Sequence, residues 1–265
     1  MIERFDHTYT FIRQNDLDAT LQRFARAGFT PLAEKRRHPS GLLTGFISLT
    51  GTYLEFASVV DEDEFQREAE TDEKIFRESP RPFGIGAVVS SPETIYSRLQ
   101  SLYPLMDKPY SRGEAAKPDG PILWTFCLIP DAATPGARVF SLKYHQSRAD
   151  RYAFKKGPNS IFAIGGFIFC AKDPAASANK WAETLRLITD DLEVSGNHLR
   201  FGFQRLEWIG PAQYRERFGE SWTVPNGSTK EICAVILLTE DLGASRSYLE
   251  KEAFQACQSN WSRAG

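Results

Sequence analysis

The chain has 265 residues, of which 42% are hydrophobic and 25% are charged, a composition typical of a soluble globular protein. Its length is sufficient for one large domain or two smaller ones with a substantial core. The net charge of −2 and the pI near 6.1 offer no basic surface to nucleic acid or to an anionic membrane. We therefore expect neither as a partner.

The cysteines and the first residues bear on the cellular compartment. Four cysteines, at positions 127, 170, 233 and 257, lie too far apart for the close pairs of a zinc site, and we interpret them as free thiols. The opening residues show neither the basic segment nor the apolar segment of a secretory signal. No apolar run reaches the length of a membrane span. These patterns predict a cytoplasmic protein.

The first predicted unit begins with a strand and a helix. Residues His7–Ile12 alternate between two faces, as in a strand, and the apolar residues of Asp16–Ala27 recur at helical spacing. Gly28 follows and is expected to end the helix. Short strands come next, and the last of them includes Tyr53–Ala57. The acidic stretch Asp61–Glu78 is interpreted as a solvated helix or a linker.

The second predicted unit repeats this order. Phe83–Ser90 is predicted to be a strand, and the following Ser91-Pro92-Glu93 favours the start of a helix that continues to Leu102. Residues 108–121 are rich in proline, glycine and charge, so we expect a loop there. Strands are expected to resume at Ile122–Ile129 and Arg138–Tyr144.

The remaining chain contains two more units after a linker at residues 146–158. The third unit is predicted to have strands at Ile161–Cys170, Leu199–Phe203 and Gln204–Ile209 and a helix at Ala175–Ile188. After a turn at Asn226-Gly227, the fourth unit is predicted to have a strand at Glu231–Leu238 and a helix at Leu242–Phe254. Its closing strands are missing from the pattern.

A short phrase of leucine, charge and aromatic residue marks the end of each of the first three units. It reads Leu54-Glu55-Phe56, Leu142-Lys143-Tyr144 and Leu206-Glu207-Trp208. Internal repetition is a strong guide to fold, and the repeated order here is β-α-β-β-β. We therefore predict an α+β fold in which repeated β-α-β-β-β units form curved mixed sheets, with the fourth unit truncated. The predicted organisation is an N-terminal pair of units in residues 1–150, which holds the site, and an incomplete C-terminal pair in residues 158–265.

Several segments of the first unit carry a resemblance to a known superfamily. They are Phe5-Asp6-His7, Asp16-Leu17-Asp18, Ala27-Gly28-Phe29, Arg37-His38-Pro39 with Gly41, and Gly51-Thr52-Tyr53-Leu54-Glu55. In this order they resemble the vicinal oxygen chelate superfamily, which includes glyoxalases, bleomycin-resistance proteins and extradiol dioxygenases. The likeness is greatest to divergent glyoxalase-like domains. It covers the first unit well and the second loosely, whereas the third and fourth units match only by repetition.

The resemblance implies that two units form a cup that holds a divalent metal ion. It maps His7 to the ligand position of the first strand and Glu55 to that of the fourth strand. Imidazole and carboxylate suit Zn, Fe, Mn or Ni, with coordination positions left open for substrate oxygens. Such an ion polarises a carbonyl or an enediolate, and Glu55 beside it is a candidate for moving protons.

The other units depart from this ligand pattern. The positions that correspond to His7 by their distance from the helix start are Pro82, Ile164 and Ile232, so a second strand histidine is absent. In the second unit the phrase has Lys143 in place of Glu55, and we expect Lys143 to bind an anionic group of the substrate. His145 lies two residues further along the same strand face and is the candidate replacement ligand or catalytic base.

The remaining candidates are aromatic and histidine residues of the first unit. Tyr9, Tyr53 and His38 are expected to contact the substrate. The alternative interpretation makes His7 a hydrogen-bonded core histidine and Glu55 one partner of a buried ion pair with Lys143. Glu207 is interpreted as a structural relic or as an ion-pair partner.

Two functions are compatible with these patterns. The first is a divalent-metal-assisted lyase, isomerase or ring-opening oxygenase that acts on a small oxygenated molecule in the N-terminal cup. The second is a metal-free protein that sequesters or senses a small molecule in the same cup. The C-terminal pair is expected to pack on the first pair or to form part of a homodimer interface.

Overall fold

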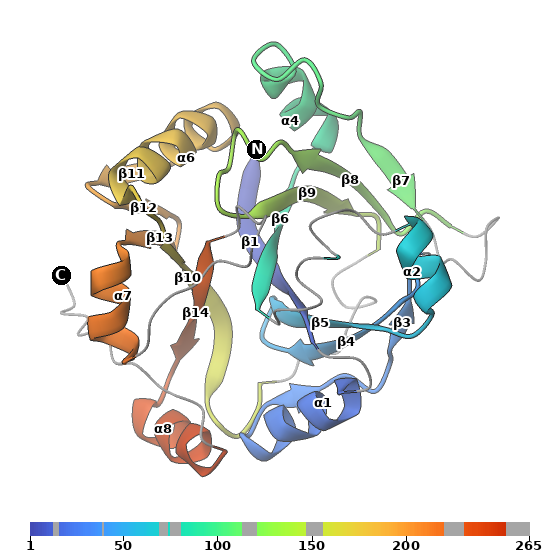
Figure 1. Ribbon diagram of the computed structural model, residues 1–265, viewed down its shortest axis with the longest axis vertical. Helices are drawn as coiled ribbons and strands as arrows, with labels where there is room; N and C mark the ends of the chain where they lie inside the picture. Colours follow the sequence, from blue (N-terminus) through green and yellow to red (C-terminus); the bar gives the residue numbers. More distant parts are fainter. Residues whose placement is uncertain are drawn as a thin grey trace.

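The computed structural model describes residues 1–12, 16–38, 40–68, 74, 81–112, 121–146, 156–219 and 231–252. Its strands form two curved mixed sheets (Figure 1). The strand order is β2-β4-β5-β1-β6-β9-β8-β7 in the first sheet, where β3 also pairs with β4, and β11-β12-β13-β10-β14 in the second sheet.

The helices and strands follow the predicted repeat. The first unit contains β1 (Ile2–Phe11), α1 (Leu17–Arg26), β2 (Thr30–Pro31), β3 (Arg36–Arg37), β4 (Leu42–Ser48) and β5 (Tyr53–Val59), and α2 (Glu62–Glu68) follows it. The second contains β6 (Pro82–Val89), α4 (Pro92–Leu99), β7 (Tyr110–Arg112), β8 (Trp124–Ile129) and β9 (Arg138–Tyr144). The third contains β10 (Ile161–Cys170), α6 (Pro174–Ile188), β11 (Glu193–Ser195), β12 (His198–Phe201) and β13 (Gln204–Ile209), followed by α7 (Pro211–Phe218). Of the fourth, β14 (Ile232–Thr239) and α8 (Leu242–Lys251) are described. The predicted α+β fold of repeated units in curved mixed sheets is confirmed.

The two sheets are built on the same plan. In the first sheet β1 and β6 run antiparallel at the centre, and each pairs in parallel with the closing strand of its own unit, β5 or β9. In the second sheet β10 pairs antiparallel with β14 and in parallel with β13. In the first sheet β9 pairs with the outer side of β6. No strand pairs with the corresponding side of β14 among the residues that the structure describes.

The main core lies between the backs of the two sheets. It is filled by residues of both sheets and of α1, α4 and α6, and its central aromatic contacts join Phe5 of β1 to Phe167 and Phe201 of the second sheet. We call the side of the first sheet that faces this core the helix face, and the opposite, concave side the inner face. In Figure 1 the inner face lies between β3, β4 and β5 on one side and β7, β8 and β9 on the other, with α2 beside it.

The helix start predicted at Ser91-Pro92-Glu93 is present, and the Ser91 side chain caps α4. The Asp173 side chain caps α6, whereas Asp16 makes no side-chain cap for α1. The turn at Asn226-Gly227, most of the linker at 146–158 and the later part of the acidic stretch lie outside the described residues. The division into domains at 1–150 and 158–265 stays a prediction. No helix in the described ranges is both long and apolar enough to cross a bilayer.

Candidate functional site

A β-bulge in β1 sets the position of the candidate site. Phe5 pairs with Ala87 of β6 and His7 pairs with the next residue, Gly86, so Asp6 is an extra residue on β1. Phe5 packs in the core behind the sheet. Because a bulge interrupts the alternation of a strand, Asp6 and His7 both direct their side chains toward the inner face.

The second sheet supports this bulge. The side-chain amide of Gln204, the first residue of β13, accepts a hydrogen bond from the Phe5 N–H at 2.6 Å and donates one to the Phe5 carbonyl at 2.8 Å. The same amide nitrogen donates to the Ile164 carbonyl at 3.0 Å. A buried backbone segment that leaves its ladder needs such partners, and here a residue of the C-terminal half supplies them.

Three titratable side chains meet on the inner face. The Nε2 atom of His7 lies 3.8 Å from one carboxylate oxygen of Glu55, and the Nε2 atom of His38 lies 3.8 Å from the other. His7 and Glu55 are buried, and His38 is also 3.2 Å from the Thr44 hydroxyl. The carboxylate of Glu55 therefore lies between two imidazoles, which can exchange protons with it.

The ring of His7 is fixed by packing on three sides. It stacks on Tyr53 with ring centroids 4.4 Å apart and an interplanar angle of 10°, and it contacts Phe140 of β9 at 5.3 Å. Its third neighbour is the backbone of Gly86, where an added Cβ would overlap the imidazole ring. Gly86 therefore leaves room for the ring to lie flat across β6.

Asp6 lies behind His7 and carries a negative charge. Its carboxylate is 3.5 Å from His7 Nδ1, accepts a hydrogen bond from Tyr144 at 2.8 Å and pairs with Arg4 at 3.0 Å. Burial alone would raise the pKa of Asp6, but the His7 contact, the Arg4 charge and the Tyr144 hydrogen bond outweigh it and lower the pKa. The Asp6 carboxylate at Nδ1 helps to orient the ring so that Nε2 lies toward Glu55.

His38 differs from His7 in its charged surroundings. Burial is the main cause of a lowered pKa for His38, and the positive charges of Arg112 and Arg36 lower that pKa further, against the opposing effect of Glu55. His38 is therefore neutral at physiological pH. Neutral imidazole is the form that accepts a proton or binds a metal ion.

The other predicted site residues divide between the two faces. Tyr9 and Tyr53 lie on the inner face with His7 and Glu55, and Tyr53 also contacts the Tyr144 hydroxyl at 3.1 Å. Lys143 and His145 do not join them. Lys143 is exposed, and His145 lies 2.8 Å from Thr125. Thr125 shares a strand face with Cys127, and Cys127 belongs to the core behind the sheet. The expectation that Lys143 and His145 enter the cup is wrong.

The physical reason is the strand alternation of β9. Phe140 contacts His7 on the inner face, and Lys143 lies three residues further along the same strand, so its side chain points to the opposite face. Aligning the leucine-charge-aromatic phrases had matched Glu55 with Lys143. A shift of one position moves a strand residue to the opposite face of the sheet.

The strand pairs also show which residues stand in the place of a second histidine. Gly86 of β6 lies opposite His7, and in β10 the position that corresponds to His7 is Gly166, because Ile168 pairs with Glu207 as Tyr9 pairs with Glu55. Counting from the helix start had instead indicated Pro82 and Ile164. No second strand histidine faces His7.

The site contains donor atoms that suit a metal ion. Imidazole and carboxylate are suitable ligands, and Asp6 behind His7 resembles the outer partner that metal-bound histidines commonly have. Within the described part of the chain, however, no three His, Cys, Asp or Glu side chains converge on a point where an ion could bind. The site thus offers a pair of donors, His7 and Glu55, and not the three protein ligands of a typical catalytic zinc site.

The corresponding acid of the second sheet has a different environment. Glu207 is paired with Arg205 at 3.2 Å and with Arg217 of α7 at 2.9 Å, and His198 lies 3.5 Å away. Two guanidinium groups neutralise this carboxylate and occupy the space beside it. This geometry agrees with the interpretation of Glu207 as an ion-pair partner.

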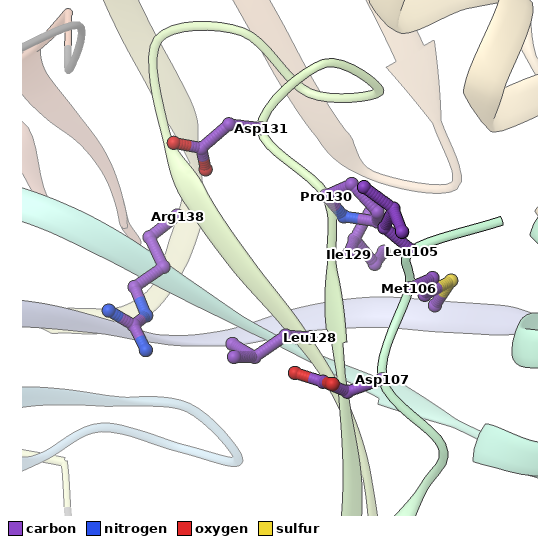
Figure 2. Close-up of a pocket in the computed structure, with 8 residues that line it drawn as sticks. All are labelled: Leu105, Met106, Asp107, Leu128, Ile129, Pro130, Asp131 and Arg138. Atoms are coloured by element: carbon purple, nitrogen blue, oxygen red, sulfur yellow. The ribbon is translucent and has the colours of Figure 1, made fainter. Parts of the chain in front are cut away.

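A separate pocket of about 240 Å³ lies at the far end of β8 (Figure 2). Its lining residues are Leu105, Met106, Asp107, Leu128, Ile129, Pro130, Asp131 and Arg138. None of the three titratable residues at the inner-face centre contributes to it. We therefore assign the candidate function to His7, His38 and Glu55 and not to this pocket.

Sequence reasoning missed four polar residues around the centre. Asp6 was part of the quoted motif, but adjacent strand residues normally face opposite sides of a sheet. No local sequence pattern predicts the bulge that turns Asp6 to the same side as His7. Tyr144 was present in the second phrase without an assigned role. Arg36 and Arg112 belong to short strands that are not distinguishable from loops by their pattern.

Comparisons with known proteins agree with this architecture. The family model described as a glyoxalase-like domain matches residues 5–185. No curated protein matches the sequence. A hypothetical protein from Staphylococcus aureus has a similar structure, with a TM-score of 0.64, 17% identity, and coverage of 88% of this chain and 90% of that chain.

Two other solved structures are similar at lower scores. A xylose isomerase-like TIM barrel/4-hydroxyphenylpyruvate dioxygenase fusion protein has a TM-score of 0.53 and 14% identity over 96% of this chain and 39% of its own. A methylmalonyl-CoA epimerase from Mycobacterium tuberculosis has a TM-score of 0.40 and 13% identity over 56% of this chain and 93% of its own. At such identities the structural likeness concerns the fold alone. The family match covers more than half of the sequence, and the chain belongs to the glyoxalase-like domain family.

Proposed function

We propose that the protein is an enzyme that binds a small oxygenated molecule on the inner face of its first sheet and moves a proton on it. The observation that carries the proposal is the position of the Glu55 carboxylate, 3.8 Å from the Nε2 atoms of both His7 and His38. A buried carboxylate with a proton-exchanging group on each side is suited to take a proton from one atom of a substrate and return it to another. This chemistry is that of an isomerase or a lyase.

The surrounding residues give each group a separate task. Asp6 orients His7 through Nδ1, and Tyr53, Phe140 and Gly86 hold the ring in place. The neutral His38 can accept a proton that Glu55 releases. The aromatic walls reduce the access of water, which strengthens electrostatic interactions inside the site.

A divalent ion is an extension of the proposal. His7 and Glu55 would hold it, in agreement with their donor types, and the bound ion would polarise a substrate oxygen as a Lewis acid. With only two protein ligands, binding is expected to be weak. The proton-transfer proposal stands on the carboxylate and the imidazoles and does not depend on the ion.

The test uses deuterium exchange with simple enolisable carbonyl compounds. Pyruvate and hydroxyacetone are incubated with the protein in D₂O, and incorporation at carbon is followed by proton NMR. We expect Glu55→Gln, which keeps the shape of the side chain but not its basicity, to lower exchange by at least about 100-fold. Metal content is measured on protein purified without a histidine tag, and exchange is repeated after chelation.

A second function is favoured by one observation, namely the lack of three converging metal donors among the described residues. It is the metal-free binding of a small molecule without turnover. Ligand binding without any exchange, unchanged by Glu55→Gln and by exhaustive chelation, would favour this second function and contradict the first.

A further inference from the structure

Two arginine side chains lie over neighbouring aromatic rings at the edge of the candidate site. Trp124 and Phe126 are two residues apart in β8 and therefore share a strand face. The guanidinium of Arg36 lies 5.9 Å from the Trp124 ring centroid, and that of Arg112 lies 5.6 Å from the Phe126 ring centroid. The two cations are thus held side by side on one aromatic surface.

Each guanidinium also has a second aromatic contact. Arg36 lies 5.8 Å from the ring of Phe46 in β4, and Arg112 lies 5.2 Å from the ring of Tyr110 in β7. An arginine stacked on aromatic rings is positioned by its flat face, and its N–H groups lie at the edge of that plane. Two such contacts for each arginine fix the direction of those edges.

This cationic surface lies next to the proton-transfer centre. Arg36 and His38 are two residues apart on one side of the chain, whereas Arg37 between them points to α2 and pairs with Glu64 at 2.5 Å. The positive charges of Arg36 and Arg112 both lower the pKa of His38, and His38 in turn lies 3.8 Å from Glu55. A molecule held by the two arginines would therefore have its other end near Glu55.

We propose that Arg36 and Arg112 bind the carboxylate of a planar, carboxylate-bearing substrate whose reacting end lies at Glu55. A carboxylate matches the planar fork of a guanidinium, and two guanidinium groups can each donate to it. The half-buried rings of Trp124 and Phe126 add apolar surface beside the two guanidinium groups. Arg36 is also paired with the exposed Glu34 at 3.7 Å.

This inference names the substrate class and rests on the proposed function, so its test must separate the two. The probes are benzoate and benzamide, which have nearly the same shape and differ in charge, and binding is measured by isothermal titration calorimetry at low ionic strength. We expect benzoate to bind at least about 10-fold more tightly than benzamide. Arg36→Met and Arg112→Met, which keep length without charge, are each expected to reduce that preference.

The matched control is Arg37→Met, which removes the charge next to Arg36 in sequence but on the α2 side. It is expected to keep the preference for benzoate, and thermal melts of all variants verify that they are folded. Arg36→Lys retains the charge without the planar fork and should restore only part of the preference.

Glu55→Gln distinguishes this inference from the proposed function. The variant is expected to keep the preference for benzoate while losing proton exchange. Equal affinities for the two probes, undetectable benzoate binding, or a preference that survives both arginine changes would overturn the carboxylate site, whatever Glu55→Gln does to exchange. Loss of exchange with a preserved carboxylate site would support both proposals.

Discussion

Gly86 shows how one position without a side chain can determine the geometry of a site. The imidazole of His7 lies directly over its backbone, between Tyr53 and Phe140. Any larger residue at position 86 would compete with the ring for the same space. The orientation of His7 toward Glu55 therefore depends on a residue of another unit that donates no functional group.

Replacing Gly86 with alanine tests this dependence. The new methyl group would overlap the His7 ring, so we expect the ring to move away from Glu55 and the free energy of unfolding to fall by about 1–3 kcal/mol. Urea unfolding measures the stability, and NMR of the His7 ring nitrogens measures the displacement. Gly243→Ala in α8, where the added Cβ lies 3.3 Å from the Asp241 side chain, is the control and should lower stability less than Gly86→Ala does. An unchanged His7 spectrum in Gly86→Ala would contradict the packing argument.

At the scale of elements, the strand alternation of the first unit was predictable and the bulge in β1 was not. Because side chains alternate with period two, the sequence correctly predicted that His7, Tyr9, Tyr53 and Glu55 face one way. The inner-face position of Asp6 depends on the bulge, which Gln204 supports by its hydrogen bonds to Phe5. Gln204 is 199 residues from Phe5 in the chain, and no local sequence pattern predicts such a contact.

The placement of Lys143 failed for a related reason. The repeated phrase is correct as a marker of the closing strands, but its charged residue faces inward in β5 and outward in β9. Only the arrangement of the folded strands reveals this difference. Repetition in the sequence thus predicted the elements and could not predict which face a residue of a later copy would occupy.

Replacing Gln204 tests the support of the bulge. In Gln204→Leu the N–H and the carbonyl of Phe5 lose their partners, so we expect the free energy of unfolding to fall by about 2–5 kcal/mol. Urea unfolding measures the loss, and hydrogen exchange at the Phe5 amide measures the local opening. Gln204→Glu, which can still accept from the Phe5 N–H, should protect that amide better than leucine does. Equal protection of the Phe5 amide in wild type and Gln204→Leu would show that the bulge has another support.

At the scale of the whole molecule, one half-buried acid, Glu231, lies where the two halves meet. The backbone N–H of Glu231, just before β14, donates to the Gly136 carbonyl in the loop between β8 and β9 at 2.6 Å. Its carboxyl oxygen Oε2 has no hydrogen-bond partner among the described residues. Burial raises the pKa of Glu231 to about 7.

This shift predicts how stability depends on pH. A raised pKa means that the folded state retains the proton, so the associated stability is present below the unfolded value of 4.5 and is lost as the pH rises through about 7. We expect Glu231→Gln to be more stable than wild type at pH 8.5 by about 1–2 kcal/mol, after allowance for partial solvent exposure, and to show a flatter profile. Urea unfolding between pH 5.5 and 8.5 measures both. Parallel profiles for the two proteins would contradict the assignment.

The pairing of His7 with Gly86 also has a consequence for stoichiometry. Four repeated units would be expected to carry several equivalent sites, yet Gly86 lies opposite His7 in β6, Gly166 takes the place of His7 in β10, and Glu207, which takes the place of Glu55 in β13, is paired with arginines. In the part of the chain that the structure describes, the repeat has therefore multiplied the scaffold without multiplying the reactive centre. A ligand that binds at His7 and Glu55 should saturate at one equivalent per chain, with a single class of sites in the titration curve.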